Sequence, residues 1–272
     1  MNPDETSQQG QTDVLDPARA NALLATLDRT EHLQAGAPLL PFFHQIYFWD
    51  ALVPGKLGRD GHPRVGQGLV PDMGLPRRMW AGGRLEFKRP LLVGREARKV
   101  TTLETTQRKQ GRTGALAFVT LRHEIWQSDT LCVVEWQDLV YRDDPDSADE
   151  TPSTICAPED VETQDILVPD PTLLFRYSAL TFNGHRIHYD VDYARKTEGY
   201  PGLVVHGPLL AQLLMLKAYD ELGDIENFAF RGVSPLAHDE QAALCRNGAD
   251  LWVSGSDGRL IMSAQVKTKP RP

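Results

Sequence analysis

The sequence predicts an α+β protein in which a long antiparallel sheet wraps around a buried helix, and in which this unit occurs twice. One observation is the segment GPLLAQLLMLKAYDELG (207–223), which is apolar on most faces and must therefore be buried on all sides. The other is the strand-like runs of aliphatic and aromatic residues, which fill both halves of the chain in a similar rhythm.

The central helix is expected to begin at Gly207-Pro208, because proline is favoured at the first helical position, and to end at Gly223. Three strand-like runs follow it, FAFRGV, AALCRNGADLWVSG and RLIMSAQVKT, and the turn GSDG (255–258) joins the last two. Before the helix, TLLFRYSALTF (172–182) is apolar and aromatic, so we expect a strand there.

The first half has matching elements. PFFHQIYFW (41–49) is expected to supply the corresponding helix or strand, and strands are expected within 83–109, 114–127 and 130–142. LEFKRPLLVGRE (85–96) and FAFRGVSPLAHDE (228–240) each contain an aromatic residue, a basic residue, Pro-Leu and then an acid. We interpret the pair as an internal duplication. Two helices, each wrapped by its own antiparallel sheet, make a double hot dog.

Charge divides the chain. Residues 143–170 hold ten acidic residues and no basic ones, and they contain prolines, so we expect an acidic linker there. It separates an N-terminal hot-dog domain over 20–142 from a C-terminal one over 171–272. Residues 1–19 are polar and acidic and are expected to form a disordered tail.

Composition excludes several classes of protein. A net charge of −8 does not favour nucleic acid as a partner. No apolar run approaches the roughly 18 residues of a membrane span, and the N-terminus lacks the basic and apolar regions of a secretory signal. Three distant cysteines without a C-x-x-C pair predict neither structural zinc nor a disulfide framework, which favours a reduced, cytoplasmic protein. Neither a Walker loop nor a G-x-S-x-G elbow occurs.

The segment FNGHRIHYD (182–190) concentrates the residues that carry chemistry. His188 can act as a general base or acid, because imidazole titrates near physiological pH. Asn183 can orient a water or a carbonyl without titrating. Gly207 at a helix N-terminus offers backbone N–H groups that stabilise a developing anion. These parts suit the addition or removal of water at a double bond beside an activated carbonyl.

RYSALTFNGHRIHYD followed by EGYPGLVVHGPLL resembles the MaoC-like double hot-dog hydratases and dehydratases. Within them, the chain is most similar to the group of mesaconyl-C4-CoA (3-methylfumaryl-CoA) and itaconyl-CoA hydratases and type 2 hydroxyacyl-thioester dehydratases. LPRRMWAGGRLEF (75–87) and WQDLVYR (136–142) resemble the N-terminal half of that group. The resemblance implies an active site in the C-terminal domain, a non-catalytic N-terminal domain that completes the acyl pocket, and Gly207 as the oxyanion donor.

The broader family carries the motif Asp-x-Asn-Pro-x-His. With the final histidine on His188, the motif aspartate falls on Asn183, and the motif asparagine falls on His185. Asn183 cannot accept a proton, so the resemblance implies that His188 carries more of the acid–base work, with His185 as a partner or a pocket wall. Asp190 is expected to orient His188 or to replace the missing carboxylate.

Basic residues are candidates for contacts with the acyl-CoA. Arg186 and Arg176 either clamp the second carboxylate of a C4 or C5 dicarboxylic acyl group or are ordinary surface arginines. Arg78 and Arg84 either bind CoA phosphates, line the acyl pocket or lie in a solvated loop. His206 shapes the helix start or takes part directly. The residues expected to contact the substrate are therefore Arg78, Arg84, Arg176, Arg186, Asp190 and His206.

The favoured function is hydration or dehydration of a branched dicarboxylic acyl-CoA, such as mesaconyl-C4-CoA or itaconyl-CoA, without a metal or redox cofactor. One alternative is a dehydratase of straight-chain 3-hydroxyacyl thioesters, whose acyl tunnel would not need a basic residue. Another is a non-catalytic acyl-CoA-binding hot-dog protein. The expected partner beyond the substrate is a second copy of the chain, in a homodimer.

Overall fold

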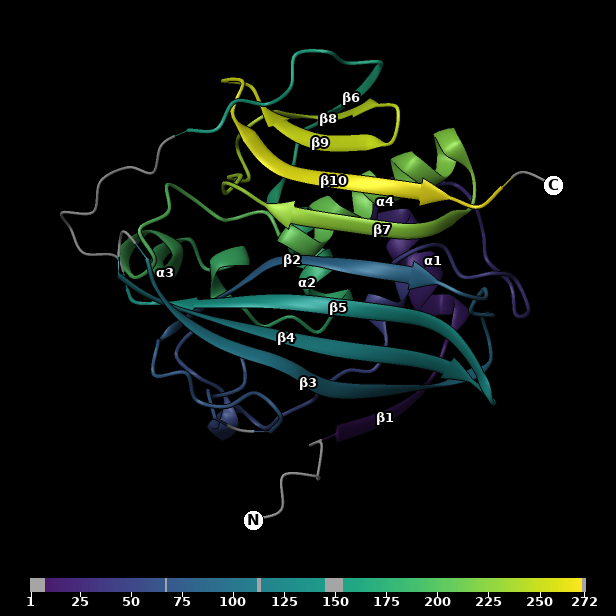
Figure 1. Cartoon of the computed structure of the whole chain (residues 1–272), viewed down its shortest axis with the longest axis horizontal. Coiled ribbons are helices and arrows are strands. Elements are labelled where there is room, and N and C mark those ends of the chain that lie inside the picture. Colours follow the sequence, from purple (N-terminus) through teal and green to yellow (C-terminus); the bar gives the residue numbers. More distant parts are fainter. Residues whose placement is uncertain (1–7, 67, 112–113, 145–153, 271–272) are drawn as a thin grey trace.

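The computed structural model describes residues 8–66, 68–111, 114–144 and 154–270, and these form one antiparallel sheet of ten strands (Figure 1). The order across the sheet is β1-β3-β4-β5-β2-β7-β10-β9-β8-β6. The strands are β1 (Gln8–Val14), β2 (Arg77–Phe87), β3 (Glu96–Gly111), β4 (Gly114–Gln127), β5 (Thr130–Arg142), β6 (Thr163–Leu167), β7 (Ile225–Gly232), β8 (Ala242–Asn247), β9 (Asp250–Gly255) and β10 (Leu260–Thr268).

The strand order is symmetric about the pairing of β2 with β7, which supports the internal duplication. Each half contributes five strands, counting its member of this pair. By their place in the order, β3, β4 and β5 of the first half correspond to β8, β9 and β10 of the second. Leu85 pairs with Phe228 across the centre, so the two similar sequence segments meet there. An isolated bridge from Pro38 to Leu92 in the first half matches one from Val204 to Ala237 in the second.

The helices lie behind the sheet in the view of Figure 1. They are α1 (Pro17–Thr26), α2 (Pro171–Leu180), α3 (Val191–Lys196) and α4 (Gly207–Leu222), with short 3-10 helices η1 (Phe43–Ile46), η2 (Pro54–Lys56) and η3 (Arg186–His188). The predicted start of α4 at Gly207-Pro208 is confirmed, as is its end at Gly223, whose φ of 94° favours glycine. Within the described residues, no helix is long and apolar enough to cross a membrane.

The two halves share one continuous sheet and differ in their helices. Among the described residues, only the C-terminal half has a long central helix, because η1 and irregular backbone take the corresponding place in the first half. Proline at 38, 41 and 54 explains this difference, since each proline removes a backbone donor and disfavours a helical residue before it. The expectation of two separate sheets, each with its own central helix, is corrected accordingly.

The prediction of a strand over TLLFRYSALTF was wrong, because most of this segment is helix α2. Asp170 caps the helix by accepting a hydrogen bond from the backbone N–H of Leu173 at 2.7 Å, and proline occupies the first turn. Leu174 and Tyr177 are buried, while Phe175 between them is exposed, which is the spacing of one helix face. Capping therefore outweighed the strand propensity of the aromatic residues.

The tail and the linker are shorter than expected. Residues 8–14 form the edge strand β1, which pairs with β3 from Gln8 to Val14, and α1 begins at Pro17. Backbone hydrogen bonds rather than apolar side chains hold β1, so composition did not indicate it. In the expected linker, β6 pairs with β8. Residues 1–7 and 145–153 lie outside the described residues.

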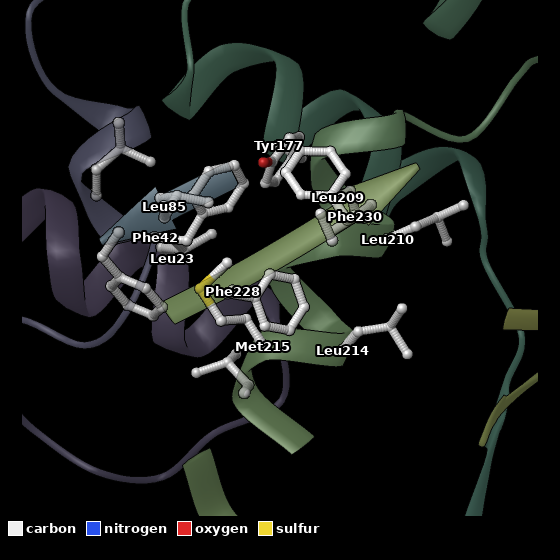
Figure 2. Close-up of a cluster of buried hydrophobic side chains, with 14 of the residues drawn as sticks. Leu23, Phe42, Leu85, Tyr177, Leu209, Leu210, Leu214, Met215, Phe228 and Phe230 are labelled. Carbon is white, nitrogen blue, oxygen red and sulfur yellow. The ribbon is translucent and has the colours of Figure 1, made fainter. Parts of the chain in front are cut away.

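The main core lies between the sheet and the helices (Figure 2). Leu209, Leu214 and Met215 of α4 pack in the same cluster as Phe228 of β7 and Leu85 of β2. Side chains from α1 and the η1 segment, including Leu23 and Phe42, join this cluster and are labelled in Figure 2. One core thus spans both halves and holds the start of α4 in place.

Adjacent positions of α2 provide a test of this packing. Replacement Leu174→Ala should lower the free energy of unfolding by about 2–5 kcal/mol, because the side chain is fully buried in the main core. Phe175→Ala is the matched control on the exposed face and should cost less than about 1 kcal/mol. Urea denaturation of both variants measures the difference. Equal losses would show that α2 does not pack in this orientation.

Candidate active site

A cavity of about 1270 Å³ lies between the two halves of the protein. Strands β2, β4 and β5 and the η1 segment line it from the N-terminal half. The end of α2, the 183–188 segment and the start of α4 line it from the C-terminal half. Of the residues predicted for the site, the cavity brings together Arg78, Asn183, His185, His188 and Gly207.

His188 is held as a neutral imidazole with one free ring nitrogen. Its Nδ1 lies 2.7 Å from the backbone carbonyl oxygen of Val204, and because a carbonyl only accepts, Nδ1 carries the hydrogen. The backbone N–H of Val204 in turn donates to the carbonyl of Ile187 at 2.9 Å, which fixes the two segments together. Burial lowers the pKa of His188 to about 3. The side chain therefore presents Nε2 as a proton acceptor.

His206 supports His188 from outside the cavity. The two imidazoles stack with ring centroids 3.6 Å apart. His206 is fully buried, and its Nε2 lies 2.8 Å from Ser178 Oγ on α2. Burial, with the neighbouring His188 as a second cause, lowers the pKa of His206 well below its ordinary value. His206 thus packs against His188 and does not line the cavity.

The N-terminus of α4 opens onto the cavity at Gly207. His206, at the N-cap position, makes no side-chain capping bond, so the first-turn N–H groups remain available to a ligand. A Cβ placed on Gly207 would meet only the carbonyl oxygen of Trp80, at 3.6 Å, which is an ordinary contact. Packing within the protein therefore does not demand glycine here, whereas close approach of a ligand to the backbone would.

Asn183 and His185 form a tight turn on the cavity wall. Asn183 Oδ1 accepts the backbone N–H of His185 at 3.0 Å, which uses this oxygen to hold the turn. The His185 ring lies edge-on to His188 with centroids 5.4 Å apart. Burial, assisted by the neighbouring His62 and His188, lowers the pKa of His185 to about 2. His185 is therefore neutral and lies beside the proposed base.

The N-terminal half contributes two polar residues that sequence reasoning missed. His62 lies against His185 with ring centroids 4.4 Å apart, and its Nδ1 is 3.1 Å from Asp60 Oδ2. Burial would raise the pKa of Asp60, but hydrogen bonds from the side chain and backbone N–H of His62 hold this pKa well below its usual range. The only signal in the sequence was the Asp-x-His spacing in DGHP, which many surface loops share.

One group within the described residues approaches the spacing of metal ligands. Candidate ligand atoms of Asp60, His62 and His185 all lie within 4.8 Å of one another. Asp60 and His62 already bond to each other, and the guanidinium of Arg78 is close enough to lower the pKa of both histidines. A fixed positive charge beside the group opposes a cation, so the arrangement fits a hydrogen-bonded cluster better than a metal centre.

A second buried polar cluster lines the wall formed by β5 and η1. His44 Nε2 and Gln45 Nε2 both lie 2.8 Å from carboxylate oxygens of Glu135. Burial alone would raise the pKa of Glu135, and the hydrogen bond from His44 reverses this and holds the pKa below its usual value. On α2, the Tyr177 hydroxyl has no partner among the described residues and also lines the cavity. Sequence reasoning assigned none of these residues.

Arg186 and Asp190 do not reach the cavity. Their side chains pair with each other, with Arg186 Nη2 and Asp190 Oδ2 2.7 Å apart. Asp190 also caps α3 by accepting the N–H of Tyr193 at 3.0 Å, and Arg186 lies over the Tyr193 ring. The predicted role of Asp190 beside His188 is therefore corrected, because capping occupies its carboxylate.

Arg84 and Arg176 also lie outside the cavity lining. Arg84 stacks on Trp136 on the outer face of the sheet and is 3.8 Å from Glu104. Arg176 is exposed on α2. Of the predicted arginines, only Arg78 lines the cavity, where its charge lowers the pKa of His62. No carboxylate of the described residues lies within ion-pair distance of Arg78.

A neutral imidazole beside an open helix N-terminus, in a cavity shared by the two halves, suits a hydro-lyase that acts on activated acyl groups. Comparison with known proteins agrees. The family model described as hydroxyacyl-thioester dehydratase type 2 matches residues 42–238, and the chain belongs to this family.

Three similar proteins stand out in these comparisons. Mesaconyl-C(4)-CoA hydratase of Chloroflexus aurantiacus is 44% identical over 258 residues, covering 92% of this chain and 91% of that protein. The mitochondrial hydroxyacyl-thioester dehydratase type 2 of Schizosaccharomyces pombe is 28% identical over 250 residues, covering 79% and 80%. A Mycobacterium tuberculosis protein with a double hot-dog fold superimposes with a TM-score of 0.60 at 13% identity, covering 97% and 96%. The predicted fold and enzyme class are confirmed.

Buried histidines make stability depend on pH in a testable way. Burial lowers the pKa of His123 to about 4, below the value of about 6.5 in the unfolded chain. The unfolded state then binds a proton that the folded state does not, so stability is complete above about pH 6.5 and falls as pH falls towards 4. His123→Gln should flatten this slope by about 1 kcal/mol per pH unit.

Denaturant unfolding between pH 7 and pH 4.5 measures this slope for the wild type and the variant. His32→Gln, on the exposed surface, is the matched control and should leave the slope unchanged. Identical slopes for the wild type and His123→Gln would contradict a neutral, buried His123.

Proposed function

We propose that this protein hydrates a branched dicarboxylic enoyl-CoA, with mesaconyl-C4-CoA as the preferred substrate. The observation that carries the proposal is the presence in one cavity of His188, the α4 N-terminus and Arg78, which has no carboxylate partner among the described residues. The 44% identity to a mesaconyl-C(4)-CoA hydratase over 92% of the chain supports the same substrate class.

The proposed reaction uses one imidazole and one oxyanion site. His188 Nε2 takes a proton from water while the water oxygen bonds to the β-carbon. The electron pair of the double bond moves toward the thioester, whose oxygen becomes an enolate held by the backbone N–H of Gly207. The His188 imidazolium then returns its proton to the α-carbon, which restores the neutral base and completes the addition of water.

Arg78 is proposed to bind the second carboxylate of the acyl group. Its guanidinium borders the cavity and influences the pKa of both His62 and His185, so it lies near the reacting end. A guanidinium binds a carboxylate through two parallel hydrogen bonds. Arg78 therefore takes the role that the sequence suggested for Arg176 and Arg186.

Itaconyl-CoA, another branched dicarboxylic ester, remains within this proposal. The straight-chain alternative is supported by the 28% identity to a mitochondrial hydroxyacyl-thioester dehydratase. A straight acyl chain would leave Arg78 without a partner, which is why we favour the dicarboxylate.

We further propose that the protein is a cytoplasmic homodimer without a metal or redox cofactor. Proton transfer and oxyanion binding suffice for the reaction, so no cofactor is needed. The three free cysteines are consistent with a reducing compartment. Exposed apolar side chains at the sheet edge, Ile166 and Val168, offer a surface that a second copy could cover.

Substrate preference tests the role of Arg78. The wild type should hydrate mesaconyl-C4-CoA with a higher kcat/KM than crotonyl-CoA, measured by loss of enoyl-thioester absorbance. Arg78→Ala should lower kcat/KM for the dicarboxylic ester by roughly 10- to 100-fold and leave crotonyl-CoA little changed, because a charged hydrogen bond is lost. Arg84→Ala, on the same strand but outside the cavity, is the control. A wild-type preference for crotonyl-CoA would sink the dicarboxylate proposal.

Removal of the imidazole tests the proposed base. His188→Ala should lower kcat by a factor on the order of 10²–10⁴, the usual contribution of general acid–base catalysis. The far-ultraviolet circular dichroism spectrum and the unfolding midpoint report whether the fold survives. His32→Ala, at an exposed site, should retain full activity. Near-wild-type turnover by a folded His188→Ala variant would remove this residue from the reaction.

A further inference from the structure

We propose that Asp60 and His62 of the N-terminal half form a second catalytic pair, whose imidazole binds the attacking water beside His188. The inference rests on the proposed hydration reaction and adds to it a group from the half that was expected to be non-catalytic. Neither residue falls on the family motif, which covers residues 183–188. The proposal therefore depends on the geometry of the cavity wall.

The orientation of His62 follows from its contact with Asp60. Asp60 Oδ2 lies 3.1 Å from His62 Nδ1, and an ionised carboxylate only accepts, so Nδ1 carries the hydrogen. Nε2 is then a lone-pair acceptor, and besides Asp60 the described side chain that hydrogen-bonds to this ring is Asn183. Val204 fixes the tautomer of His188 in the same way. Two imidazoles with their Nδ1 hydrogens committed therefore face one cavity.

Backbone contacts hold this pair against the 183–188 segment. The N–H of Arg186 donates to the carbonyl of Asp60 at 2.9 Å. A Cβ on Gly61 would lie 1.9 Å from the carbonyl oxygen of Gly184, so no larger residue fits at position 61 without moving the loop. The φ of Gly61 is also 86°. This close fit places His62 against the His185 ring and is unusual for an ordinary surface loop.

A second acceptor gives the water a defined orientation. Water has two O–H groups, and His188 Nε2 takes the proton of one of them. The other O–H can donate to His62 Nε2, which directs an oxygen lone pair at the β-carbon. Asn183 Oδ1 already accepts the backbone N–H of His185, which leaves this oxygen one further lone pair. The proton that His188 removes returns to the α-carbon, so the pair holds the water and undergoes no net change.

Asp60 keeps His62 in this form. Its carboxylate stabilises the Nδ1–H tautomer and any positive charge that develops on the ring as the water loses its proton. Replacement by asparagine would preserve an oxygen acceptor while removing the charge. Replacement of His62 by alanine would remove the acceptor for water altogether.

The test is a rescue experiment on hydration of mesaconyl-C4-CoA and crotonyl-CoA. His62→Ala should lower kcat by a factor on the order of 10² with little change in KM, and Asp60→Asn should lower it less. The Asn183 side chain hydrogen-bonds to the His62 ring. Asn183→Asp would therefore place a carboxylate acceptor near the position of the lost imidazole. The double variant His62→Ala/Asn183→Asp should have a kcat at least tenfold higher than that of His62→Ala. A purely structural role of His62 would not produce this recovery.

Controls separate the possible outcomes. His32→Ala should behave as the wild type, and His188→Ala/Asn183→Asp should show no recovery. Near-wild-type kcat for His62→Ala, or a loss that Asn183→Asp does not relieve, would overturn the inference. Activity that disappears on dialysis against a chelator and returns with zinc would also overturn it, because the cluster would then hold a metal. If the wild type hydrates only crotonyl-CoA, the proposed substrate fails while the rescue is still measured on that ester.

Discussion

The antiparallel pairing of β2 with β7 is the contact on which the rest of the structure depends. It joins two sets of five strands into one sheet and places one cavity across both halves. Two glycines allow the strands to approach: a Cβ on Gly82 would lie 2.6 Å from the Phe230 carbonyl, and one on Gly83 would lie 2.6 Å from the Trp136 carbonyl. The pairing of β2 with β5 shifts register between Trp80 and Gly82, and Arg78 lies just beyond this shift.

Asymmetry between the halves explains where the cavity is. The strand order is the same on both sides of the central pair, but α4 has only the short η1 as its counterpart. Residues of the η1 segment, including His44 and Phe48, line the cavity. The short η1 therefore leaves space for the cavity, and α4 lies with its N-terminus at the cavity wall. The symmetric strand order thus builds the sheet, and the difference between η1 and α4 opens the cavity.

Sequence reasoning succeeded where the signal is local. Strands β4 and β5 occupy the predicted ranges 114–127 and 130–142, since side chains on β4 alternate between more and less buried positions. The start of α4 followed from the Gly-Pro pair, and the clustered residues Asn183, His185 and His188 line one cavity. It failed where distant contacts decide. Pairing with β3 holds β1, and a loop more than a hundred residues away brings His62 to His185. Arg186 pairs with Asp190 four residues later, although the sequence interpretation assigned both residues to the substrate.

Burial is what makes this cluster of imidazoles useful. His188, His185 and His206 are enclosed within contact of one another, and each has its pKa lowered. Three charged rings so close would repel strongly, so the neutral forms that a base requires are also the forms that the fold tolerates. Hydrogen bonds from Nδ1 to Val204 and Asp60 then decide which nitrogen carries the hydrogen on His188 and His62. The fold therefore sets both protonation state and tautomer, and since Asp60 comes from the other half, neither half alone can form the complete cluster.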